Sequence, residues 1–308
     1  MLSHEVLLLV LFNVLILGLL ALDLFVFHKD PHRVTTKEAA FFSAVWITLS
    51  LIFNAGIFLF MGPRAGMEFF TGYVIEKALS VDNIFVFLVI FSYFGVPSAY
   101  QHRVLFWGVV GALIMRSLFI LIGTALISRF EWVLYVFGVI LLYSGWKLLK
   151  AEEIEVHPEK NVIIRATKKL FPHVTTGYDP PTFFTRRGGV VFITPLLLVL
   201  LTIETSDIMF AVDSIPAVFG VTRDPFIVYS SNVFAILGLR ALYFLLAGAM
   251  TRLYYLSSGL ALVLIVIGIK MLLEPFVHVP IGWSLAVVVG IIGVAVVASM
   301  IKKRTGHV

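Results

Sequence analysis

The sequence predicts an all-α, polytopic membrane protein with about nine transmembrane helices. Its 308 residues are 60% hydrophobic and 13% charged, and the mean hydropathy is +1.03, values outside the range of soluble globular domains. The apolar residues gather in runs long enough to cross a hydrocarbon core of about 30 Å. One acidic motif occurs twice within these runs, at residues 76–83 and 204–216. Together these observations favour a membrane protein with an internal repeat.

The first apolar run begins soon after Met1, with no basic residue before it and no small-residue cleavage site after it. We therefore expect an uncleaved first span and not a signal peptide. Further runs of spanning length follow along the chain. The predicted spans are residues 6–27, 39–61, 69–94, 104–127, 132–149, 191–219, 227–249, 253–273 and 281–301.

The basic residues predict the orientation of these spans. When the loops are assigned alternately to the two sides, Lys and Arg concentrate on one side, chiefly within residues 147–187 and 302–304, whereas Arg64, Arg129 and Arg223 fall on the other. The rich side is cytoplasmic by the positive-inside rule. The predicted location is therefore a bacterial inner membrane, with the N-terminus outside and the C-terminus in the cytoplasm. The net charge of +5 reflects these loops and does not indicate a nucleic-acid partner.

The longest polar segment divides the chain into three parts. We expect an N-terminal membrane half (1–150), a cytoplasmic linker without a core of its own (151–190) and a C-terminal membrane half (191–308). Cysteine is absent from the sequence, which excludes disulfides, thiolate metal sites and cysteine-based catalysis.

The two acidic motifs extend into a longer repeat. Aligning Val81-Asp82-Asn83 with Val212-Asp213-Ser214 places Glu76 on Asp207. The next two helices also correspond, because Arg116 recurs as Arg240 and Gly145-Trp146-Lys147 recurs as Gly268-Ile269-Lys270. The third span enters from outside and the sixth from inside, so the two three-helix units are inverted. Inverted repeats of this kind place a binding site between the halves and favour a transport function.

The repeated acids are expensive to place in a membrane. Each Asp at the centre of a spanning helix costs about 2.5 to 3.5 kcal/mol, so a compensating function or partner is expected. On straight helices Glu76 and Asp82 face different directions, as do Asp207 and Asp213. We therefore predict at least one discontinuous motif helix, broken near Pro216 or loosened near Ser80.

The candidate ligands supply only oxygen atoms. Such a set suits Mn²⁺, Mg²⁺ or Ca²⁺ better than soft metals, and crowded carboxylates can exchange a metal for protons. The alternative is that the acids pair with Arg116, Arg240, Lys77 and Lys270 and only hold helices together. Arg116 and Arg240 are interpreted as counter-ions or gates, because a cation repels a metal ion. The candidates are Glu76, Asp82, Asn83, Glu204, Asp207, Asp213 and Ser214.

Residues 204–217, 224–228 and 231–244, together with residues 76–83, closely resemble the TerC family of integral membrane proteins. Within it the sequence looks most like the Alx-type branch, and the wider relationship is to LysE-like exporters. The resemblance implies inverted three-helix units, Mn²⁺ export and a response to alkaline pH, and the family name refers to tellurium resistance. Carried over by position, the implied metal ligands are Glu76, Asp82, Asn83, Glu204, Asp207 and Asp213.

These observations predict an exporter of Mn²⁺ or a related hard divalent cation, coupled to protons and working by alternating access. The metal is the expected substrate, the bilayer is the expected surrounding, and no cofactor is expected. A rival hypothesis is a scaffold or sensor of a metal or tellurite stress complex, with protein partners bound through residues 151–190. An intramembrane enzyme is not expected, because the Gly-x-Gly-Asp motif of aspartyl proteases and the His-Glu-x-x-His motif of zinc proteases are both absent.

Overall fold

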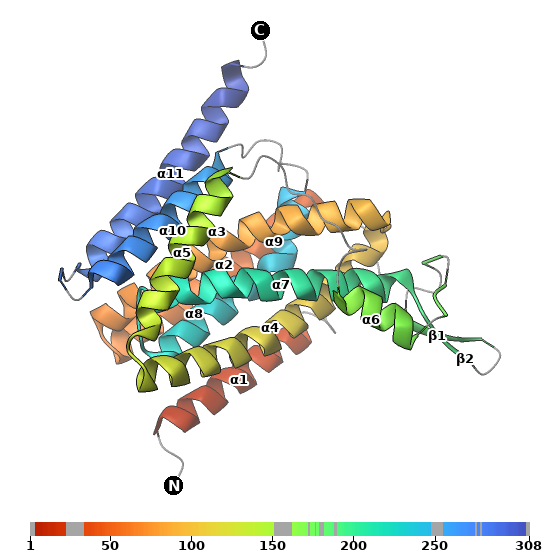
Figure 1. Ribbon diagram of the computed structural model, residues 1–308, viewed down its shortest axis with the longest axis horizontal. Helices are drawn as coiled ribbons and strands as arrows, with labels where there is room; N and C mark the ends of the chain where they lie inside the picture. Colours follow the sequence, from red (N-terminus) through yellow and green to blue (C-terminus); the bar gives the residue numbers. More distant parts are fainter. Residues whose placement is uncertain are drawn as a thin grey trace.

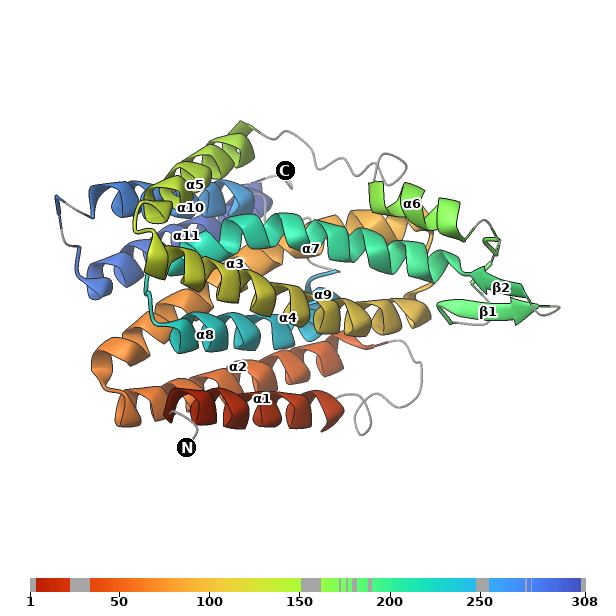
Figure 2. The same cartoon turned by 60° about the horizontal axis from the view of Figure 1, so that its bottom comes forward.

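The computed structural model describes residues 4–22, 34–150, 162–171, 173–175, 177–178, 182–187, 190–247, 255–274, 276–277 and 279–305. Its long helices lie side by side in a bundle, and the segment between the two halves gathers at one end (Figures 1 and 2). We call this the linker end, because it carries α6 (Val162–Leu170), β1 (Phe184–Arg187) and β2 (Val190–Ile193).

Within the described ranges, every predicted span overlaps a helix or a helix pair, while residues 23–27, 248–249 and 253–254 of these spans lie outside those ranges. Six of these helices are long and apolar enough to cross a membrane, or up to seven spans when the bent pair α8 and α9 is taken as one, among the residues described. The fold is therefore all-α and polytopic, as predicted. The helices are α1 (His4–Leu22), α2 (Thr36–Phe60), α3 (Pro63–Phe94), α4 (Ser98–Arg129), α5 (Val133–Lys150), α7 (Pro195–Phe219), α8 (Pro225–Leu237), α9 (Leu239–Leu246), α10 (Leu256–Leu273) and α11 (Ile281–Thr305).

Local sequence sets the helix ends. Thr35 caps α2 in a capping box with Glu38, which satisfies two backbone N–H groups that have no helical partner. Gly95 ends α3 in the left-handed conformation, with φ of 62°. Asp224 accepts hydrogen bonds from the N–H groups of Phe226 and Ile227 at the start of α8.

The predicted break in a motif helix is wrong, because α3 and α7 are both continuous. Pro216 lies in the last turn of α7, so the kink it favours falls where the helix is about to end. The break occurs instead at Gly238, where α8 and α9 meet with a bend of 40°. There the Lys77 ammonium donates to the carbonyl oxygen of Ala235 at 3.1 Å. That carbonyl belongs to the last turn of α8, whose oxygens lack helical partners.

The predicted span 191–219 begins later than expected. Residues Val191–Ile193 belong to β2, which pairs antiparallel with β1, and the helix starts at Pro195. Proline disfavours helical backbone at the preceding residue and suits the first helical position itself. The strand therefore ends where the helix begins.

The segment between the halves packs against the membrane helices at the linker end. The buried residues Ile164, Ile193 and Leu198 form a small apolar cluster with Phe94 at the end of α3. The Tyr178 hydroxyl donates to the carbonyl oxygen of Phe94, and partial burial raises the pKa of this phenol. The described part of the linker is therefore docked, while residues 151–161 lie outside the part of the chain that the structure describes.

The contacts between helices repeat when the two units are exchanged. The motif helix α3 packs on α8, the second helix of the other unit, and α7 packs equivalently on α4. In the same way α7 contacts α5 and α3 contacts α10, while the pairs α3–α7 and α5–α10 join corresponding helices. The ends of α3 and α7 are reversed, since Gly72 lies near Val218 and Phe94 near Leu198. The two units are thus interlocked and inverted.

Glycines bring α5 and α10 into close contact. A Cβ atom added at Gly268 would lie 2.9 Å from the carbonyl oxygen of Gly138, and one added at Gly145 would lie 2.7 Å from that of Ala261. The repeat aligns Gly145 with Gly268 and Gly138 with Ala261, so these two contacts are equivalent. We call this contact the glycine seam. It allows backbone approach that a larger side chain would prevent.

Candidate functional site

A buried arginine lies at the centre of the molecule. Arg116 on α4 donates from Nε and Nη2 to the two carboxylate oxygens of Asp207, at 3.2 and 3.0 Å. Its Nη1 donates to Glu76 and to the Ser214 hydroxyl, the latter at 3.1 Å. The amide of Asn232 donates to the second oxygen of Glu76 at 3.1 Å. We call these five residues the Arg116 network.

The Arg116 network is almost completely shielded from the surroundings. Relative exposure is 0% for Glu76 and Asn232, 2% for Arg116 and Ser214, and 3% for Asp207. Glu76 and Asp207 are equivalent positions of the repeat, so a single arginine serves both copies. The interpretation of Arg116 as a counter-ion is confirmed. Buried carboxylates such as Glu76 and Asp207 require a cationic partner of this kind.

The second arginine of the repeat lies elsewhere. Arg240 follows the break at Gly238 and is buried, at 5% exposure. Together with Asp207, it lines a small cavity of about 10 Å³ between α4, α7 and α9. The equivalent arginines thus have different surroundings, and the two units differ at the α8–α9 break, since α4 is continuous.

The other two motif aspartates face a larger cavity. Asp82 on α3 and Asp213 on α7 both line a cavity of about 550 Å³, bounded also by α5. Asn83, Ser144, Lys147 and Ser214 line it too, among apolar side chains. Ser214 also belongs to the Arg116 network, so the network and the cavity adjoin. We call this space the aspartate cavity.

Each aspartate of the cavity accepts a hydrogen bond from the other unit. Ser144 of α5 donates to Oδ1 of Asp213 at 2.6 Å, and Ser257 of α10 donates to Oδ1 of Asp82 at 2.8 Å. α5 belongs to the unit of Asp82, and α10 belongs to the unit of Asp213. The bonds therefore cross between the units in both directions.

Glu204 lies apart from both groups. Its carboxylate faces α4, where a Cβ added at Gly111 would lie only 2.1 Å from Oε1. Glu204 is partly exposed, and it makes no hydrogen bond or ion pair with any residue that the structure describes. The absent side chain at Gly111 therefore provides the space for this acid.

The predicted ligands occupy three places. Glu76 and Asp207 belong to the Arg116 network, Asp82, Asn83 and Asp213 line the aspartate cavity, and Glu204 faces Gly111. Within the described ranges, no three Asp, Glu or His side chains form a group that could hold a metal ion. Two carboxylates with amide and hydroxyl oxygens remain in the aspartate cavity, a donor set of the kind that hard divalent cations bind together with water.

Several polar residues of this region were not predicted as site residues. Asn232 is one of them, although a buried amide in an apolar helix is itself a signal. Ser144 and Ser257 carry no such signal, because they lie 69 and 175 positions from the aspartates they contact. The alternative hypothesis paired Lys77 with an acid, but its ammonium lies at the α8–α9 break.

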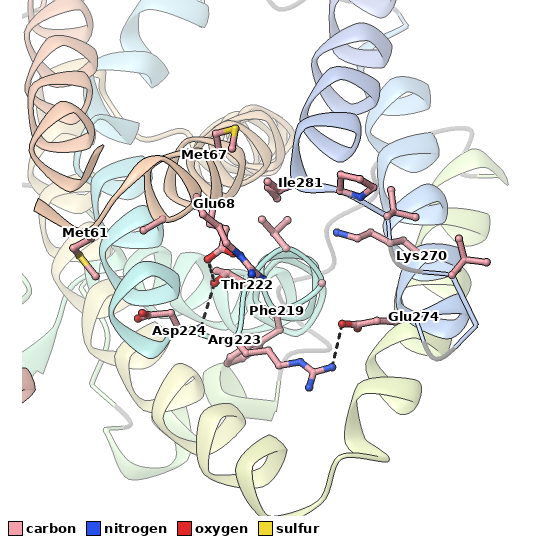
Figure 3. Close-up of a pocket in the computed structure, with 17 residues that line it drawn as sticks. Met61, Met67, Glu68, Phe219, Thr222, Arg223, Asp224, Lys270, Glu274 and Ile281 are labelled. Atoms are coloured by element: carbon pink, nitrogen blue, oxygen red, sulfur yellow. Dashed lines mark hydrogen bonds and ion pairs between the residues drawn. The ribbon is translucent and has the colours of Figure 1, made fainter. Parts of the chain in front are cut away.

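A further cavity lies at the end opposite the linker. It has a volume of about 800 Å³ and is lined by the start of α3, the 220–224 loop and the end of α10. Figure 3 shows the loop joined to both neighbours, since Thr222 donates to Glu68 at 2.6 Å and Arg223 pairs with Glu274 at 3.2 Å. We call this pair of contacts the outer clasp. It fixes the loop that follows the second motif.

Comparison with known proteins places this arrangement in a family. The chain is 50% identical to "Uncharacterized membrane protein STKORF319" of Myxococcus xanthus over 293 residues, which cover 95% of this chain and 92% of that protein. It is 48% identical to "Putative membrane-bound redox modulator Alx" of Escherichia coli K12 over 290 residues, 91% of this chain and 90% of the relative. An "Uncharacterized membrane protein" of Rickettsia bellii is 40% identical over 295 residues, 96% and 97% of the two chains.

No solved structure matches the chain. The model of the integral membrane protein TerC family matches residues 61–307, a range that includes both acidic motifs, the Arg116 network and the aspartate cavity. The chain therefore belongs to the TerC family of integral membrane proteins.

Proposed function

We propose that this protein exports a hard divalent cation across a bacterial inner membrane, with Mn²⁺ as the physiological ion and protons as the exchanged species. The observation that carries the proposal is that Asp82 and Asp213, equivalent residues of an inverted repeat, line one cavity between the two units. A site between inverted units can open to each side in turn. The choice of Mn²⁺ follows from the oxygen donors and from the family resemblance.

Asp82, Asp213 and Asn83 are the direct ligands in this proposal, with water completing the coordination shell. Glu76 and Asp207 contribute to the electrostatic field at the aspartate cavity. They become metal ligands only when Arg116 moves away. Glu204, which faces α4, is a further ligand along the proposed path of the ion through the protein. In this scheme the linker end is cytoplasmic, and the outer clasp lies on the far side of the membrane. The function is transport, without a chemical step on a substrate.

The test uses purified full-length protein in sealed vesicles that contain a metal-sensitive dye. Mn²⁺, Mg²⁺, Ca²⁺ and Zn²⁺ are supplied in turn, with and without a pH gradient. We expect Mn²⁺ flux that depends on the gradient and is lost in Asp82→Asn and Asp213→Asn. Glu131→Gln is the matched control, because this exposed acid lies outside the aspartate cavity. Absence of any cation flux from folded protein would refute the proposal.

A second candidate function is a scaffold for a stress-response complex. One observation favours it: the hairpin of β1 and β2 exposes Phe184, Val190 and Val191, each at 45% to 52%. Exposed apolar side chains on a polar segment are typical of a contact surface. Replacing these three residues by Ser separates the candidates, because a scaffold loses its function while an autonomous transporter still moves Mn²⁺ in vesicles.

A further inference from the structure

Each of the two serines that bond the cavity aspartates lies on the third helix of one unit and contacts the motif helix of the other. Each donates its hydroxyl proton to one oxygen, Oδ1, of an aspartate from the opposite unit. An ionised carboxylate has two oxygens, which accept hydrogen bonds and donate none. The bond to Oδ1 therefore restrains each aspartate side chain and leaves Oδ2 for another partner.

The two helices that carry these serines, α5 and α10, pack tightly against each other. The glycine seam holds α5 and α10 at backbone contact, and the buried residues Leu141 of α5 and Leu264 of α10 belong to one apolar cluster. Because of this contact, Ser144 and Ser257 are placed relative to each other by backbone packing and not by flexible side chains. Through the two hydrogen bonds, the seam constrains where the two aspartates can lie relative to each other.

We propose that Ser144 and Ser257 are positioning residues that hold Asp213 and Asp82 in the geometry needed to bind one divalent cation in the aspartate cavity. This inference rests on the proposed function. Residues that orient metal ligands through hydrogen bonds commonly contribute 10- to 100-fold to metal affinity. Neither serine is a direct ligand in this role, and each acts through the aspartate it contacts.

The experiment measures Mn²⁺ affinity by calorimetry on the purified full-length chain in detergent. We expect Ser144→Ala and Ser257→Ala each to weaken binding by about 10-fold or more. Ser144→Thr keeps the hydroxyl and is expected to retain affinity within about 3-fold. Thr202→Val is the matched control, since among the described residues its buried hydroxyl bonds only to the Leu198 carbonyl of its own helix.

A double-mutant cycle separates positioning from a general effect on folding. If Ser144 acts through Asp213, Ser144→Ala adds less than about 2-fold in the Asp213→Asn background, whereas a general structural effect appears equally in both backgrounds. Unchanged affinity in both serine variants, with Mn²⁺ binding that still depends on Asp213, would overturn the positioning role alone. If the wild-type chain does not bind Mn²⁺, the proposed function fails first.

Discussion

Arg116 donates to both carboxylate oxygens of Asp207, at 3.2 and 3.0 Å, although the residues lie 91 positions apart on helices of different units. A planar guanidinium matches a carboxylate in this two-point geometry. The same group also bonds Glu76, so two repeat-related acids share one cation. One acid from each motif is therefore stabilised by Arg116 in the centre of the fold.

Removing this cation should destabilise the protein strongly. Arg116→Gln leaves Glu76 and Asp207 buried without a counter-ion, which costs about 3 to 5 kcal/mol for a buried pair. We expect a lower thermal unfolding temperature in detergent and poor recovery from the membrane. Arg116→Lys keeps the charge but loses the two-point contact, so its loss of thermal stability should be intermediate between those of the wild type and Arg116→Gln.

The surface pair of Arg64 and Glu68 provides the control, because Arg64 is 81% exposed. Arg64→Gln should change stability by no more than about 1 kcal/mol. Equal losses in Arg64→Gln and Arg116→Gln would contradict the central role of the Arg116 network.

The glycine seam predicts a sharp dependence on residue size. Gly268→Ala places a methyl group 2.9 Å from the Gly138 carbonyl oxygen, so α5 and α10 must separate. Overpacking of this kind costs about 1 to 3 kcal/mol. Unfolding should begin at a lower temperature than in Gly290→Ala, where a Cβ meets nothing within 4 Å. Identical unfolding curves for the two variants would show that the seam does not require glycine.

If the protein transports Mn²⁺ as proposed, the outer clasp allows a test of whether the 220–224 loop moves during transport. The sequence holds no cysteine, so a Glu68→Cys/Thr222→Cys pair can be joined with a short thiol crosslinker without background reaction. We expect crosslinking to stop Mn²⁺ flux in vesicles, because the loop is then held to α3 permanently. Cleaving a reducible crosslinker should restore flux.

The single variants Glu68→Cys and Thr222→Cys, treated with the same reagent, control for modification of either residue alone. Full flux through the crosslinked double variant would mean that this loop stays in place during transport. Figure 3 shows the two side chains that the crosslink would replace.

Docking of the linker should depend on alkaline pH through Tyr178. Its neutral hydroxyl donates to the Phe94 carbonyl, and burial raises its pKa. A raised folded-state pKa means that the contribution is fully present below the ordinary value of about 10 and is lost as the pH rises through the folded value. Proteolysis within residues 184–193 should therefore accelerate above about pH 10.

Tyr178→Phe removes the titrating group while it keeps the ring. Cleavage of this variant, normalised to an unstructured peptide at each pH, should lack the alkaline acceleration. The same pH dependence in the variant and the wild type would assign the effect to another group.

Much of this protein was determined by the sequence itself. Hydropathy located the membrane helices, since burial in a bilayer requires long apolar runs whatever their neighbours are. The positions 76 and 207, 82 and 213, and 116 and 240 revealed the repeat, because an internal duplication is visible in one dimension. The role of Arg116 as a counter-ion followed from the cost of placing an unpaired charge in a membrane.

Only the tertiary structure decided how these residues are grouped. Glu76 and Asp82, six positions apart, face different partners because their directions on a continuous helix differ by about 120°. The contacts of Ser144 with Asp213 and of Ser257 with Asp82 depend on the packing of α5 against α10, which local sequence does not specify. The break at Gly238, and not near Pro216, likewise depends on Lys77 from α3, whose ammonium reaches a carbonyl 158 positions away. These features arise from contacts between distant segments, and such contacts exist only once the chain has folded.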